Sequence, residues 1–143
     1  MKKLILGLAL GLVSTQPVFA ACAASNLAGT WIILGGTNNN FQGVAKGTVV
    51  ISSTGVVDAT KSSIGFVVPT STGLGTFSTK LTGKLSVNTT CAVSGTLTTA
   101  KTSYIDYAVY TISGQMDNSD KNTISSIYRT STYDIGMINW VKQ

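Results

Sequence analysis

The sequence predicts an all-β protein: an antiparallel up-and-down meander of roughly eight to ten strands that closes into a small eight-stranded barrel. Beyond residue 20, no segment keeps apolar side chains at the i, i+3, i+4 and i+7 spacing of an amphipathic helix. Apolar and polar residues alternate instead, with the two-residue period of a half-buried strand. Turn clusters interrupt this alternation at intervals too short for crossover helices, so we expect neighbouring strands to pair antiparallel. A two-layer β-sandwich is the alternative arrangement.

The clearest strand covers residues 80–87, where Leu81, Gly83 and Leu85 share one face and polar side chains occupy the other. A short link at 88–90 joins it to a strand at 91–98, so this pair is predicted to form a hairpin. The remaining predicted strands cover residues 30–34, 44–52, 56–59, 64–68, 74–79, 104–113, 123–130 and 134–142, with 44–52 and 56–59 forming a second hairpin.

Glycines within the inward-facing rows favour the barrel over the sandwich. Gly47, Gly83 and Gly95 each stand at a position that the alternation assigns to the interior. Because glycine has no Cβ, it permits the kinks and close approaches that strong strand curvature needs. We therefore expect these strands to bend around a closed barrel.

The first 20 residues have the pattern of a bacterial-type secretory signal peptide. Lys2 and Lys3 precede an apolar run at 4–13, and small residues stand before a cut after Ala20. The run has about half of the roughly 20 residues that span a bilayer. The sequence thus predicts a leader at 1–20 and a single exported domain at 21–143, in the periplasm or secreted.

The chain has two cysteines, Cys22 and Cys91. In an oxidising compartment the simplest expectation is one disulfide, which would tie the mature N-terminus to the middle of the chain. The alternative is a lipoprotein, because residues 19–22 resemble a lipobox in which Cys22 would be acylated. Membrane attachment is expected only in that case.

The composition excludes much of the usual catalytic chemistry. The chain contains no His and no Glu, so mechanisms built on imidazole, a Glu general acid or a His-ligated metal are ruled out. Without a base, no Ser is a candidate nucleophile. Lys2 and Lys3 contribute part of the formal net charge of +5, and the other basic residues form no run. We therefore predict a protein that is not an enzyme, with no cofactor, no metal and no nucleic-acid partner.

The segment at 26–31 contains Gly29-Thr30-Trp31, which resembles the opening strand of lipocalin and avidin-type calycin barrels. In those families the Trp closes one end of the barrel. In lipocalins a basic side chain from a late strand packs over that Trp, and Arg129 and Lys142 are the candidates here. The resemblance covers about six residues; it implies a small barrel and transfers no ligand.

Five residues are candidates for a ligand site at the barrel mouth: Trp31, Phe41, Tyr104, Asp106 and Tyr110. Tyrosines combine an apolar ring with a polar tip, which suits a binding surface. Asp106 shares a strand face with Tyr104 and Tyr110, and a buried carboxylate there would need a partner such as a tyrosine hydroxyl.

The leading hypothesis is an exported, non-enzymatic barrel that binds a small apolar or amphipathic molecule or a protein partner. A first alternative is a structural or surface-interaction module without a cavity, whose strands pair with a partner or with copies of itself. A second is a small outer-membrane barrel, since alternating strands also fit lipid outside and polar groups inside.

Overall fold

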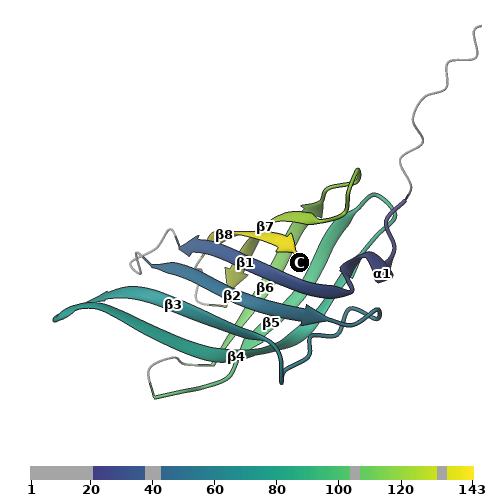
Figure 1. Cartoon of the computed structure of the whole chain (residues 1–143). Helices are drawn as coiled ribbons and strands as arrows, with labels where there is room; N and C mark the ends of the chain where they lie inside the picture. The colour runs from purple at the N-terminus through teal and green to yellow at the C-terminus, as the bar shows by residue number, and fades with distance from the viewer. Residues whose placement is uncertain (1–20, 38–42, 104–106, 132–134) are drawn as a thin grey trace, which may run out of the picture.

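The computed structural model describes residues 21–37, 43–103, 107–131 and 135–143, which form a closed antiparallel β-barrel (Figure 1). Each strand pairs with the next in sequence, and the last pairs with the first. This confirms the predicted eight-stranded up-and-down barrel and rules out the sandwich. The elements are α1 (Ala24–Leu27), β1 (Gly29–Thr37), β2 (Val44–Ile51), β3 (Ser63–Thr70), β4 (Gly73–Val87), β5 (Ala92–Thr99), β6 (Ala108–Met116), β7 (Thr123–Thr130) and β8 (Ile135–Lys142).

Two predictions of strands differ from the structure in more than their end residues. The strands expected at 74–79 and 80–87 are one continuous strand, β4, because its pairing with β3 runs without a break from Gly73 to Lys80. The strand expected at 56–59 makes only isolated bridges, from Val56 to Lys84 and from Val57 to Ile51. The chain turns away again at Asp58, so β2 takes β3 as its neighbour.

Inward-facing glycines allow the strands to curve. Gly83 and Gly95 have φ angles of 142° and 149°, in a region that side-chain-bearing residues rarely adopt. A Cβ at either residue would overlap a backbone carbonyl oxygen of the facing strand, that of Thr96 or of Lys84. The close approach of the facing strand that was expected at these two glycines is therefore present.

The barrel interior is apolar. Buried positions on the strands include Ile33, Val49, Leu81, Leu97 and Ile112, while many outward positions carry Lys, Ser or Thr. A membrane-spanning β-barrel instead surrounds a polar lumen with an apolar band. The described interior is thus the reverse of what the outer-membrane alternative requires. Within the described ranges, no helix has the length and hydropathy to cross a bilayer.

One end of the barrel, here called the closed end, is sealed by the start of the chain. Leu27 of α1 is fully buried, and the predicted disulfide joins Cys22 to Cys91, with 5.0 Å between their Cα atoms. Trp31 lies beneath α1 and donates its indole N–H to the Leu27 carbonyl over 2.7 Å. The disulfide fixes α1 to the turn between β4 and β5, so the N-terminal segment forms a lid on this end.

A basic side chain from β8 covers Trp31. The Nζ atom of Lys142 lies 5.5 Å from the centre of the Trp31 ring and donates to the Asn26 carbonyl over 3.0 Å. Such a cation–π contact is worth roughly 0.5–2 kcal/mol. Of the two candidates, Lys142 takes this position, whereas Arg129 is exposed on β7.

Candidate ligand cavity at the barrel mouth

A small cavity lies toward the opposite end of the barrel, here called the mouth, where β1, β3, β5 and β7 end and β2, β4, β6 and β8 begin. The enclosed part of the cavity leaves about 20 Å³ for the centre of a water molecule. Together with the opening to solvent, the empty space is about 420 Å³. These volumes describe a narrow throat, with room for about one or two waters, that widens into solvent. The lining residues are Ile33, Gly35, Ala45, Ile64, Phe66, Leu81, Leu97, Tyr110, Tyr128 and Ile138.

Aromatic side chains form one part of the cavity wall. The rings of Tyr110 on β6 and Tyr128 on β7 meet edge to face, with 5.5 Å between centroids and 74° between planes. This arrangement suits the quadrupoles of two aromatic rings. Phe66 adds a half-buried ring from β3, while the small residues Gly35 and Ala45 stand on β1 and β2. The cavity lies between these aromatic rings and the two small residues.

No charged residue lines the cavity among the residues that the structure describes. The described carboxylates of Asp58, Asp117 and Asp120 belong to turns at the closed end and bond to nearby groups. We find no cluster of three metal-ligating side chains in the described part of the chain. The cavity therefore favours an uncharged ligand over an ionic one, because burying an unpaired charge is costly.

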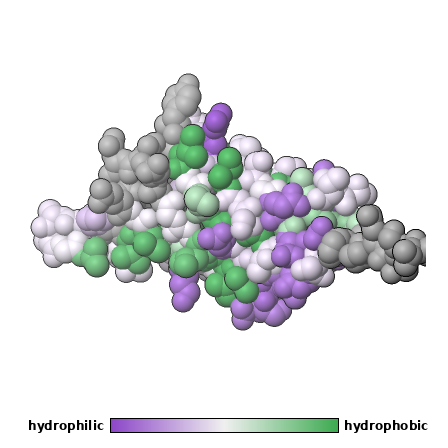
Figure 2. Space-filling view, turned by 90° about the horizontal axis from the view of Figure 1, so that it is seen from above, coloured by the Kyte–Doolittle hydropathy of each residue, from purple (hydrophilic) through white to green (hydrophobic). Residues whose placement is uncertain are grey.

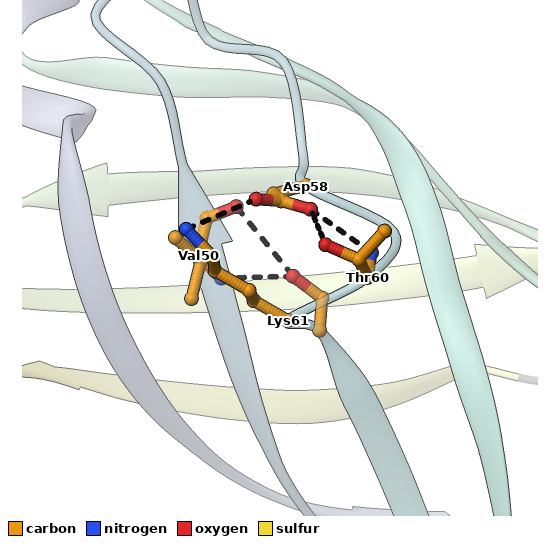
Figure 3. Close-up of polar contacts among 5 residues, drawn as sticks. Val50, Asp58, Thr60 and Lys61 are labelled. Carbon is orange, nitrogen blue, oxygen red and sulfur yellow. Dashed lines mark hydrogen bonds and ion pairs between the residues drawn. The ribbon is translucent and has the colours of Figure 1, made fainter.

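Figure 3 shows the β2–β3 turn around Asp58. The Asp58 carboxylate accepts hydrogen bonds from the hydroxyl and the backbone N–H of Thr60, at 2.6 and 2.9 Å, and lies 3.6 Å from the Lys61 ammonium group. These contacts, chiefly the Thr60 hydroxyl, hold the pKa of Asp58 below its usual 3.8. The turn is fixed to β2 because the Ser62 hydroxyl accepts the Val50 N–H over 2.9 Å. The Asp58 carboxylate thus has a structural role in its turn.

The structure places two of the five predicted site residues, and it separates them. Tyr110 lines the cavity. Trp31 is fully buried at the closed end and does not line it. Phe41, Tyr104 and Asp106 lie outside the described residues. Trp31 is thus a closing residue of the barrel end, as the calycin resemblance implies.

Phe66 and Tyr128 line the cavity but are not among the five predicted site residues. Tyr128 follows Ile124 and Ser126 at two-residue steps, and both of those side chains are buried. The alternation alone therefore places Tyr128 inside the barrel. Phe66 likewise stands two residues after the buried Ile64.

The outer surface near the mouth carries exposed apolar side chains. Figure 2 shows the molecule from above, with most of the exposed hydrophobic residues in the left half of the view. Cross-strand pairing aligns Ile127 with Met137, Met137 with Gly36, Gly36 with Val44, and Val44 with Val67. We call these five residues the outer apolar row; Met137, for example, is 63% exposed. The row offers a second apolar surface, separate from the cavity.

Comparison with known proteins supports the fold alone. No known family matches the sequence, and neither does any curated protein. Among solved structures, a de novo designed fluorescence-activating β-barrel matches with a TM-score of 0.56 and 15% identity over 85% of this chain and 99% of that one. A redesigned β-barrel, mFAP1, bound to DFHBI, matches with a TM-score of 0.56 and 16% identity over 85% and 98%. A calycin-like small barrel is compatible with this architecture, and the chain is structurally similar to small closed eight-stranded barrels.

Proposed function

We propose that the protein is an exported, calycin-like barrel that binds a small, uncharged apolar or amphipathic molecule at its mouth. The observation that carries this proposal is the uncharged cavity lined by Phe66, Tyr110 and Tyr128, at one end of a barrel whose other end is sealed. The Cys22–Cys91 disulfide is compatible with an oxidising compartment. Because no carboxylate or amine lines the described cavity, we propose binding rather than catalysis.

The cavity volume indicates how a ligand would enter. A narrow throat for one or two waters is smaller than the roughly 300–1,000 Å³ of an ordinary small-molecule pocket. A larger ligand would therefore displace side chains, and the Tyr110 and Phe66 rings are the half-buried ones at the opening. Among the solved neighbours, the redesigned barrel mFAP1 holds a small molecule, DFHBI, which supports the view that this architecture can contain one.

The test is titration with Nile red, a neutral apolar dye whose fluorescence rises in an apolar environment. We expect saturable binding by the purified protein. Ala45→Phe puts a ring into the cavity and should weaken binding at least about tenfold. The added ring costs roughly 1–3 kcal/mol of stability through overpacking, so circular dichroism must show that the fold is kept.

The matched control is Ile127→Ser, which removes an exposed apolar side chain from the outer apolar row. Dye affinity should stay within about twofold of the wild type if the cavity is the site. Loss of binding in Ile127→Ser with full binding in Ala45→Phe would contradict the proposal. That result would favour the second candidate, a surface-interaction module, which the exposed outer apolar row supports.

A further inference from the structure

Two strands extend beyond the barrel at its mouth. β3 pairs with β2 only as far as Val67, and β4 pairs with β5 only from Leu81 onward. Residues 68–75 therefore pair only with each other as a two-stranded hairpin, and residues 76–79 continue the β4 edge of this hairpin along β3. We call residues 68–79 the arm. Figure 1 shows this hairpin reaching past the ends of the neighbouring strands. The arm exposes Leu74, which is 77% accessible to solvent.

One edge of the arm carries backbone groups that no described strand pairs with. At its base, the Leu81 N–H bonds the Ser62 carbonyl beside β3, and the Lys80 carbonyl accepts the Ala100 N–H on the β5 side, each at 3.1 Å. The β3–β4 register runs from Gly73 to Lys80 without a bulge. Because backbone direction alternates along a strand, the N–H and C=O groups of three residues point to the β5 side, where no described strand pairs with them. These residues are Leu74, Thr76 and Ser78.

The two edges of the arm differ in protection. Natural proteins blunt exposed strand edges with proline, lysine or a bulge. The β3 edge has Pro69, which lacks an N–H. The β4 edge has neither proline nor any charge from Gly73 to Thr79, and its first lysine is Lys80, where β5 begins to cover the strand. The unprotected edge is thus confined to the part of β4 whose β5 side no described strand covers.

We propose that this β4 edge pairs antiparallel with the same edge of a second copy, so that the arms join two barrels into a twofold dimer. The register that matches outward donors to acceptors is centred on Thr76, which faces Thr76 of the other copy. Leu74 then faces Ser78, and about six hydrogen bonds form. An isologous contact of this kind uses one surface twice and closes on itself.

The side chains in this register are complementary. Gly75 of one copy faces Phe77 of the other, and an aromatic ring packs well across a strand pair from a glycine. Within one copy the Phe77 ring already lies 2.9 Å from where a Cβ of Gly75 would be, so only a residue without a side chain fits there unless the ring moves. No like charges meet, since the nearest lysine is Lys80. The β4 edge can therefore pair with the β4 edge of a second copy without charge repulsion.

The test is sedimentation velocity of the purified, disulfide-intact protein over a dilution series. We expect a reversible monomer–dimer equilibrium. Thr76→Pro removes the outward N–H and leaves the β3 ladder intact, and Thr76→Lys sets two ammonium groups against each other at the twofold axis. Each should raise the dimer dissociation constant at least about tenfold.

Ser113→Lys is the matched control, because Ser113 is exposed on β6 and β6 is paired on both sides. It should leave the dimer unchanged. A wild-type protein that stays monomeric up to about 1 mM overturns the proposal, as does a dimer that Thr76→Lys leaves intact or that Ser113→Lys weakens equally. Circular dichroism checks the fold of Thr76→Pro; if that variant unfolds, Thr76→Lys decides. Nile red binding should be the same in Thr76→Lys, which separates this proposal from the cavity.

Discussion

At the scale of single residues, Gly83 and Gly95 allow β4 and β5 to approach each other closely. Gly83→Ala and Gly95→Ala each force a side chain into a positive-φ conformation and against a backbone carbonyl of the facing strand. Because this neighbour is backbone, it has no rotamer that relieves the overlap. We expect each substitution to lower the free energy of unfolding by at least about 2 kcal/mol. Urea denaturation followed by tryptophan fluorescence measures this loss.

Gly36 provides the control for the same chemical change. It lies on β1, its φ is not in the strained range, and a Cβ there would meet no atom within 4 Å. Gly36→Ala should therefore change the free energy of unfolding by no more than about 0.5 kcal/mol. Equal losses in Gly36→Ala and Gly83→Ala would mean that the cost comes from strand glycines in general, and not from positive φ and overlap with the facing backbone.

At the scale of elements, two closed-end turns depend on ionised carboxylates. The Thr60 hydroxyl holds the pKa of Asp58 below 3.8, and the Ser119 hydroxyl does the same for Asp117. In both cases the folded pKa lies below the unfolded one. The stabilising contribution is therefore fully present above the unfolded pKa and is lost as the pH falls through the folded pKa. An NMR titration of the side-chain carboxyl carbons should give midpoints below 3.8 for Asp58 and Asp117.

Thr60→Ala separates these two turns. It removes the hydroxyl donor to Asp58 and leaves the bonds between Ser119 and Asp117 in place. The pKa of Asp58 should rise toward 3.8, while that of Asp117 should not move. An unchanged midpoint for Asp58 would show that the Thr60 hydroxyl does not stabilise its carboxylate.

At the scale of elements, the sequence predicts which side chains lie inside the barrel but not how deep they lie along its axis. Alternation predicts whether a side chain lies inside or outside the barrel, and it carries this information for Tyr110 and Tyr128, which both line the cavity. Alternation does not give depth along the barrel axis, because depth depends on the register between strands distant in sequence. Trp31 and Tyr110 both point inward, yet one seals the closed end and the other lines the mouth. The strand predicted at 56–59 forms only isolated bridges because the chain turns at Asp58.

At the scale of the whole molecule, the two ends of the barrel differ in construction. The closed end combines α1, two buried tryptophans and the disulfide, with the Trp140 indole N–H donating to the buried Ser126 hydroxyl over 2.9 Å. The mouth has the cavity and the protruding arm. The disulfide and the buried tryptophan hydrogen bonds are therefore concentrated at the closed end, and we expect the mouth to open locally before the closed end does.

The disulfide is a covalent constraint on this architecture, and it joins residues with a sequence separation of 69. Cys91 has a φ of 66° in the β4–β5 turn, a conformation that costs a residue other than glycine roughly 1–2 kcal/mol. Replacing both cysteines by alanine should lower the free energy of unfolding by up to about 4 kcal/mol, because the unfolded chain regains its loop entropy. Cys22→Ala with Cys91→Gly should recover about 1 kcal/mol of that loss, since glycine adopts positive φ freely. Urea denaturation of the wild type and both double variants under oxidising conditions measures the two differences. If the glycine variant is no more stable than the double alanine variant, the β4–β5 turn has changed its conformation without the disulfide, and the closed end then depends on that bond for its shape as well as for its stability.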